Sequence, residues 1–147
     1  MVYGNRLIPG MVSCFSVMLL LCLFSCSSGT EPETDCDPHT GSCTKQAGAY
    51  TITLDINPKP VQHMKELTFD VSIAGDPAAA LPDTIRLDLS MPGMDMGKNQ
   101  VELNKTGEGH YSGTGIIVKC PSGRVLWRAT LLISETLNPS FTFNVRD

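Results

Sequence analysis

The chain alternates between apolar and polar residues over most of its length after residue 50. The pattern is clear where Ile52, Leu54 and Ile56 are separated by polar side chains. A period of two residues is typical of β-strands with one buried side and one solvent-facing side. Together with a segment that follows a Gly-rich turn, the alternating runs make seven expected strands: 52–56, 67–73, 85–89, 101–103, 110–118, 125–133 and 141–145.

Turn-forming residues separate these strands, among them Asn57-Pro58, Pro92-Gly93 and Asn138-Pro139. No segment carries a sustained apolar repeat of 3.6 residues, which would predict an amphipathic helix. Short strands with regular turn signals predict an all-β fold, an immunoglobulin-like antiparallel β-sandwich of about seven strands. We expect Phe69 and Trp127 to face each other across its core.

Consecutive strands of such a sandwich run antiparallel, so alternate connections lie at the same pole. The connections 57–64, 91–99 and 119–124 are therefore expected to meet. If Lys105 pairs with His110, the same ladder places Asp95 opposite Cys120, to within about two residues. His110 lies at the other pole, roughly 20–30 Å away at about 3.3 Å per strand residue.

The shared pole collects sulfur and imidazole side chains around the segment Met91-Pro92-Gly93-Met94-Asp95-Met96-Gly97. Thioethers, thiols and imidazoles are soft ligands that suit Cu(I) better than Mg²⁺ or Ca²⁺. The candidate metal ligands are Met91, Met94, Met96, Cys120 and His63. In the alternative interpretation the methionines fill the open end of the sandwich as flexible apolar residues. Cys120 is then a small buried residue and His63 a surface imidazole.

The N-terminal sequence is typical of a targeting segment. Arg6 precedes an apolar run over residues 11–24, which is short for a membrane span and fits a signal peptide. The run ends in Leu23-Phe24-Ser25-Cys26, which resembles the lipobox of bacterial lipoproteins. The resemblance implies that Cys26 is lipidated and, with Ser27 next, that the protein is sorted to the outer membrane facing the periplasm. A plain signal peptide cut nearby, or a short membrane anchor, is the alternative.

These features divide the chain into a signal peptide over residues 1–25, an acidic polar tether over 26–46 and a domain over 47–147. In an oxidising compartment, Cys36 and Cys43 are expected to form a local disulfide, because Pro and Gly lie between them. A metal site formed by Cys36, His39 and Cys43 is the alternative, although the spacing C-x6-C matches no recognised zinc or redox motif.

The charges exclude one class of partner. The 11 basic and 15 acidic residues give a net charge of −4, and basic residues do not cluster as a nucleic-acid surface requires. No catalytic triad, paired carboxylates or phosphate-binding loop is apparent. We therefore expect a protein that is not an enzyme and does not bind nucleic acid.

Three short motifs carry a resemblance that covers about residues 50–143. They are the Met-rich turn, Gly107-Glu-Gly-His-Tyr-Ser-Gly113, and Ser122-Gly-Arg-Val-Leu-Trp127. In these the chain resembles the YtkA-like family of bacterial extracytoplasmic domains, which is related to FixH-like proteins. The resemblance implies an immunoglobulin-like sandwich, attachment to a membrane and a role in handling metals, copper especially. Among the candidate ligands it covers only Met91, Met94 and Met96, because many members have an apolar residue where this chain has Cys120.

The expected function is therefore a lipid-anchored extracytoplasmic domain that binds copper or passes it on, with a metal-efflux or copper-delivery protein as its partner. The alternative is a structural or accessory module that docks on a membrane or efflux complex and binds no metal.

Overall fold

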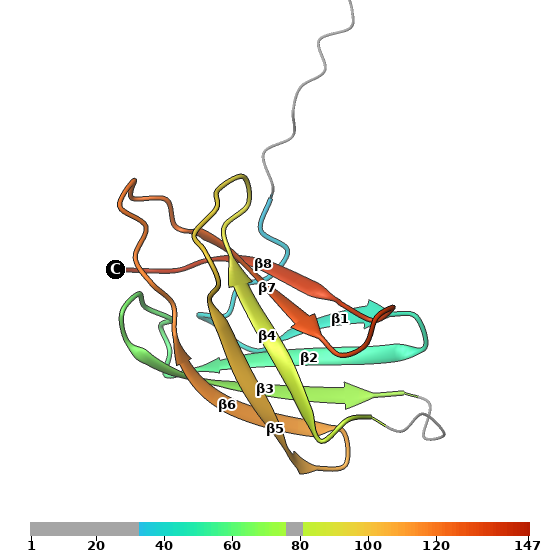
Figure 1. Cartoon of the computed structure of the whole chain (residues 1–147). Coiled ribbons are helices and arrows are strands. Elements are labelled where there is room, and N and C mark those ends of the chain that lie inside the picture. Colours follow the sequence, from blue (N-terminus) through green and yellow to red (C-terminus); the bar gives the residue numbers. More distant parts are fainter. Residues whose placement is uncertain (1–32, 76–80) are drawn as a thin grey trace, which may run out of the picture. The chain divides into compact units, whose positions relative to one another are not determined.

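The computed structural model describes residues 33–75 and 81–147 (Figure 1). The predicted signal peptide and the predicted lipidation site Cys26 lie outside these residues. The described part contains no helix, and so none that is long and apolar enough to cross a membrane. It forms eight strands: β1 (Cys43–Ala47), β2 (Tyr50–Asn57), β3 (Glu66–Ala74), β4 (Thr84–Ser90), β5 (Gln100–Gly107), β6 (His110–Ile116), β7 (Leu126–Leu132) and β8 (Ser140–Asn144).

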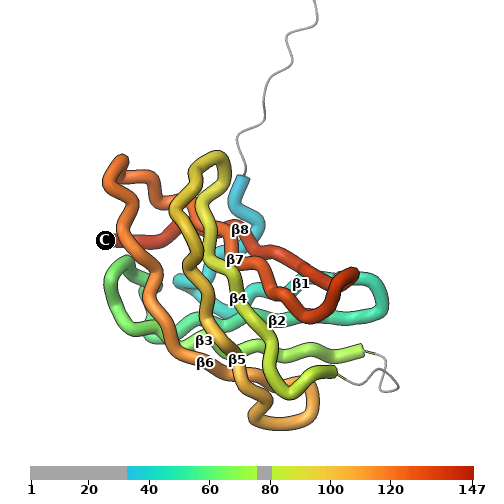
Figure 2. Tube along the Cα trace, viewed as in Figure 1, coloured from blue at the N-terminus to red at the C-terminus, as the bar shows by residue number. Residues whose placement is uncertain are grey.

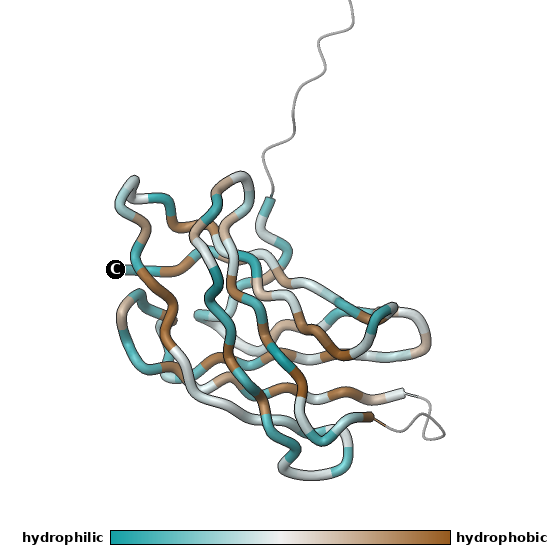
Figure 3. The backbone as a smooth tube through the Cα atoms, viewed as in Figure 1, coloured by the Kyte–Doolittle hydropathy of each residue, from teal (hydrophilic) through white to brown (hydrophobic). Residues whose placement is uncertain are grey.

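Seven of these strands coincide with the seven predicted from the sequence, and the all-β prediction is confirmed. The apolar residues of each alternating run are the buried ones in the structure. In β2, for example, Ile52, Leu54 and Ile56 are fully buried, while their neighbours are partly exposed. Figure 3 shows the same alternation of hydrophobic and hydrophilic positions along the strands. Phe69 and Trp127 are both fully buried in the core, as the pattern predicts.

The eight strands form one antiparallel sheet in the order β1-β2-β3-β6-β5-β4-β7-β8. The hairpin of β5 and β6 connects two halves, and β4 and β5 cross β2 and β3 in the view of Figure 1. Buried side chains from both halves belong to a single cluster, so the sheet folds over on itself. The result is an antiparallel β-sandwich that is nearly closed into a barrel.

The folded sheet brings three connections to one end. The β4–β5 and β6–β7 connections lie side by side in Figure 2, and side chains of the two are in contact. The β2–β3 connection joins them, because the Met64 N–H donates to the Ile117 carbonyl at 2.9 Å. The sequence argument about a shared pole therefore holds.

The register of the β5–β6 hairpin differs from the predicted one by a β-bulge. Lys105 lies opposite Tyr111, Gly107 lies opposite His110, and the register shifts between the two pairs. Such a bulge adds one residue to one strand of the pair. At the turn, Gly109 has φ 65°, and a Cβ there would lie 2.4 Å from the Ile73 carbonyl oxygen, so only glycine fits.

The prediction of a tether over residues 26–46 is wrong for the part that the structure describes. The compact unit includes the described residues from Glu33 onward. Strand β1 pairs with β2 along its whole length, and Cys43 is only 6% exposed. The segment is too polar to resemble a packed strand, yet Asp35 hydrogen-bonds the backbone of Thr142 in β8. Composition alone does not show such a contact.

Candidate metal centre

The Met-rich segment continues β4 and turns back sharply. The Met94 N–H donates to the Met91 carbonyl at 3.1 Å, and Gly93 has φ 73°. Pro at the second position and a left-handed Gly at the third are the residues that a type II β-turn requires. After the turn, the Gly97 N–H donates to the Asp95 carboxylate at 2.9 Å. The local sequence thus fixes a compact loop rather than a loose one.

The three methionines of this loop differ in burial. Met91 is 3% exposed and belongs to the hydrophobic core. Met94 and Met96 are partly buried and pack against the edge of that core. Met91 therefore fits the alternative interpretation, in which it fills space. The other two thioethers lie at the rim, between the core and solvent.

Cys120 lies in the β6–β7 connection, directly against this loop. Its sulfur is 3.4 Å from the Met94 sulfur, to which the thiol donates. A turn holds it there, since the Gly123 N–H donates to the Cys120 carbonyl at 3.0 Å. The residue is 2% exposed and is the one free cysteine among the described residues. The structure therefore brings two of the predicted soft ligands into contact.

Ser122 is a neighbour of this sulfur that sequence reasoning did not single out. Its hydroxyl oxygen lies 3.0 Å from Cys120 Sγ. Hydrogen bonds from the Ser122 hydroxyl and N–H lower the pKa of the Cys120 thiol, burial opposes them, and Arg124 adds a smaller lowering effect. Because the thiolate is the form that binds metals, the surroundings favour ligation. The turn-forming sequence Pro121-Ser122-Gly123 was the available signal that Ser122 would lie close to Cys120.

His63, also a predicted ligand, is held in the core beside Trp127. The Trp127 indole N–H donates to His63 Nε2 at 3.2 Å. Nδ1 therefore carries the proton and faces the Asp147 carboxylate at 3.3 Å. A hydrogen bond from Lys119 is the main cause that lowers the pKa of this carboxyl. Both ring nitrogens are engaged within the protein, and His63 is 6% exposed, so the expectation of a surface imidazole is wrong.

His110 lies in the β5–β6 hairpin, at the end of the sheet opposite the Met-rich loop (Figure 1). Its Nδ1 is 3.0 Å from the Ser72 hydroxyl on β3. The prediction that this histidine is remote from the sulfur atoms is confirmed.

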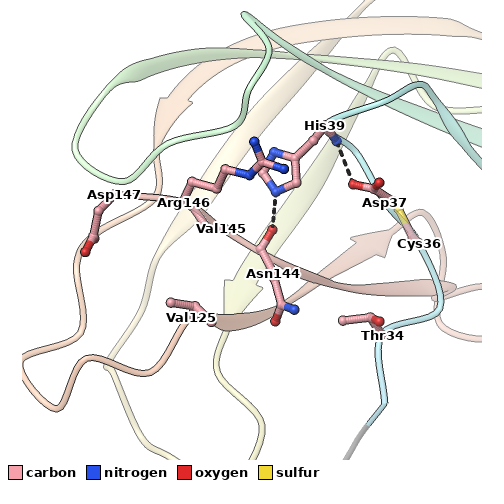
Figure 4. A pocket seen from close by; sticks show the side chains of 9 residues that line it. All are labelled: Thr34, Cys36, Asp37, His39, Val125, Asn144, Val145, Arg146 and Asp147. Carbon is pink, nitrogen blue, oxygen red and sulfur yellow. Dashed lines mark hydrogen bonds between the residues drawn. The ribbon is translucent and has the colours of Figure 1, made fainter.

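The N-terminal cysteines are joined to each other. Cys36 and Cys43 form a disulfide with Cα atoms 5.6 Å apart, so neither sulfur is a free thiolate. This excludes, in the oxidised protein, the alternative metal site that combines them with His39. Over residues 33–75 and 81–147, no three His, Cys, Asp or Glu side chains converge as metal ligands. An open pocket of about 600 Å³ lies beside the disulfide, lined by Cys36 and His39 among others (Figure 4).

Comparison of the chain with models of known protein families, with curated protein sequences and with solved structures finds no match. The resemblance to YtkA-like domains stays a prediction that rests on the motifs quoted above.

Proposed function

We propose that this protein is a lipid-anchored extracytoplasmic domain that binds Cu(I) and passes it on. Cys120 and Met94 are the core of the proposed site, and Met96 is a further ligand from the same loop. The observation that carries the proposal is the 3.4 Å contact between the two sulfur atoms. It joins two connections that are 26 residues apart in the sequence.

The donor set favours a soft ion. A thiol and a thioether prefer Cu(I) over ions that take oxygen ligands. The hydrogen bonds of Ser122 lower the pKa of Cys120 and so help the thiol to lose its proton to a metal. Met91 is buried in the core, where it supports the loop as an apolar side chain. His63 is left out of the proposed site because Trp127 and Asp147 already occupy its nitrogens.

The proposed surroundings follow from the N-terminal sequence. A lipid on Cys26 would attach the domain to a membrane, with the outer membrane facing the periplasm as the proposed location. A metal-efflux or copper-delivery protein is the proposed partner, as the resemblance to YtkA-like domains implies.

The alternative is an accessory module that docks on a membrane or efflux complex without metal. Two exposed apolar side chains favour it, Met64 at 63% exposed and Ile116 at 45%. The Met64 N–H donates to the carbonyl of Ile117, the residue after Ile116, so the two exposed residues belong to neighbouring segments of the chain. Exposed apolar groups that lie together are a feature of protein-binding surfaces.

A Cu(I) titration against a competing chelator separates the two functions. The soluble chain without residues 1–26 is compared with Met94→Leu and Cys120→Ser, and Met64→Leu is the matched control. Met94→Leu keeps the apolar volume and removes the thioether. The proposal expects about tenfold weaker binding for Met94→Leu, which corresponds to about 1.4 kcal/mol. It expects loss of tight binding for Cys120→Ser and no change for Met64→Leu. No binding by any of the four proteins favours the accessory module, and equal binding by all four would place the copper site away from Cys120 and Met94.

A further inference from the structure

The end of the sheet that carries the Met-rich loop is rich in cations, and we call it the sulfur pole. It consists of the β2–β3, β4–β5 and β6–β7 connections, residues 58–65, 91–99 and 117–125. These connections contain one carboxylate, Asp95, and five cations: Lys59, Lys65, Lys98, Lys119 and Arg124. The cations are far apart in the sequence, and contacts between the three connections gather them. The described connections at the other end contain no Lys or Arg and three carboxylates: Asp83, Glu108 and Glu135.

Most of these cations are not neutralised within the protein. Two form salt bridges, Lys59 with Asp55 and Lys119 with Asp147. Among the described residues no carboxylate lies within salt-bridge distance of the other three, which are Lys65, Lys98 and Arg124. The two lysines are exposed and the arginine is partly exposed. Glu66 and Asp95 are the exposed carboxylates of the same segments and are fewer than the free cations, so a net positive charge remains at the sulfur pole.

The exposed large apolar side chains of the described residues lie at this same pole. Met64 is 63% exposed in the β2–β3 connection, Ile116 is 45% exposed at the end of β6, and Val125 is 40% exposed just before β7. Met64 has φ 57°, a left-handed conformation that is uncommon for a residue of this type. The turn therefore presents an apolar side chain to solvent, directly beside the free cation of Lys65.

This combination of side chains fits a membrane surface better than a protein partner. Protein interfaces are depleted in Lys, whereas four of the five cations at the sulfur pole are Lys. Cations around exposed apolar side chains are typical of peripheral membrane contacts, in which apolar groups enter the interface and Lys and Arg attract anionic headgroups. The charge of the opposite end has the reverse sign, so an anionic surface attracts one end of the domain and repels the other.

The N-terminal segment enters the domain near this pole. Asp35 binds Thr142 of β8 through its N–H and its carboxylate. Thr142 pairs with Arg128 of β7, which pairs with Ser90, the last residue of β4 before the Met-rich loop. Three strand spacings, about 15 Å, therefore separate Asp35 from the start of that loop. Cys26 precedes Glu33 by seven residues, which reach at most about 25 Å. The lipid anchor of the proposed function would thus hold the sulfur pole close to a membrane.

We propose that the sulfur pole is a membrane-docking surface for anionic phospholipids. Met64 enters the lipid interface, and Lys65, Lys98 and Arg124 lie on the headgroups. Each such cation strengthens binding only about fivefold, so the contact is weak for the free domain. The proposed anchor makes the contact intramolecular and thereby raises its occupancy. Docking needs no metal, and it turns the pair of Cys120 and Met94 toward the membrane surface.

Vesicle binding tests the proposal in the chain without residues 1–26, which keeps every residue that the structure describes. Binding to phosphatidylcholine vesicles that contain phosphatidylglycerol is compared with binding to vesicles of phosphatidylcholine alone, in the absence of copper. We expect binding to the anionic vesicles only, and weaker binding in added salt. The double variant Lys65→Gln with Lys98→Gln should bind about 25-fold more weakly. Lys105→Gln, near the β5–β6 turn at the other end, is the matched control and should bind as the parent does.

A spin-labelled lipid in the same vesicles reports the orientation of the bound domain by NMR. The amide signals of Met64, Lys65 and Arg124 should broaden, and those of Glu108 and Glu135 should not. No binding to anionic vesicles, equal binding to both kinds, equal loss in Lys105→Gln and the double variant, or broadening at the acidic end would each overturn the proposal. Because copper is absent throughout, these results do not depend on the proposed metal site, and the two proposals can fail separately.

Discussion

At the residue scale, the chemistry of the candidate site depends on neighbours that a sequence pattern does not display. Cys120 was predicted as a ligand because the topology places it near the Met-rich loop, and its sulfur does contact Met94. The role of Ser122 and the exclusion of His63 were not predicted, because each depends on hydrogen bonds that only the folded chain defines. The residue types suggested five candidate ligands, and the hydrogen bonds and contacts of the folded chain favour Cys120 and Met94 over His63.

Removal of the Ser122 hydroxyl should raise the pKa of Cys120. In the parent chain this pKa is lowered first by that hydroxyl, so the thiolate persists to lower pH than in an ordinary cysteine. Ser122→Ala should therefore shift the pH profile of thiol alkylation to higher pH, and Cu(I) binding should be lost earlier as the pH falls. Ser112→Ala, on β6, removes a hydroxyl that binds Asp70 and serves as control. Identical alkylation profiles for all three proteins would contradict this assignment.

Loss of the Trp127 side chain should be strongly destabilising. The indole is fully buried, and its N–H satisfies His63, so truncation leaves a cavity and an unpaired buried acceptor. We expect Trp127→Ala to lower the free energy of unfolding by about 3–5 kcal/mol, measured by chemical denaturation. Val125→Ala, at a 40% exposed site that precedes β7, should cost far less. Equal stability of the two variants would be inconsistent with the core position of the indole.

At the scale of elements, the sequence predicted the strands that bury a regular apolar face and missed the strand that does not. In β2 and β3 alternate residues enter the core, and the period of two reveals them. Strand β1 buries Cys43 but otherwise presents Thr, Lys and Gln. It is held by backbone pairing with β2 and by the contacts of Lys45 with Asp35 and β8. A composition-based boundary at residue 47 therefore fell inside the folded domain.

Reduction of the Cys36–Cys43 disulfide should destabilise the whole domain, because the segment is part of the fold rather than a tether. Closure of a loop of this size restricts the unfolded chain and stabilises the fold by about 2–3 kcal/mol. Because the N-terminal segment packs on β8, this stabilisation extends to the whole domain. A thermal midpoint lower by roughly 10 °C is expected for a domain of about 100 residues. Calorimetry of Cys120→Ser with and without reductant isolates the effect. An unchanged midpoint would mean that the disulfide adds nothing to the stability of the domain.

At the scale of the whole molecule, the strand directions predicted which connections meet, whereas the predicted strand register did not give the residues that pair. Alternating strand direction brings three connections to one pole, and this placed Cys120 against the Met-rich loop. The exact partner differs from the predicted one because the β5–β6 hairpin contains a bulge and the two connections leave the sheet before they meet. The near closure of the sheet through Asp35 could not be predicted, since it joins residues 107 positions apart through polar groups.

X-ray absorption at the copper edge tests the central claim most directly, that Cys120 and Met94 bind Cu(I) together. The Cu(I)-loaded parent chain is compared with Met94→Leu and with Met64→Leu. We predict a first coordination shell of sulfur alone in the parent and in Met64→Leu, and a shell that loses one sulfur in Met94→Leu. A shell dominated by nitrogen or oxygen, or a sulfur shell unchanged in Met94→Leu, would contradict the account.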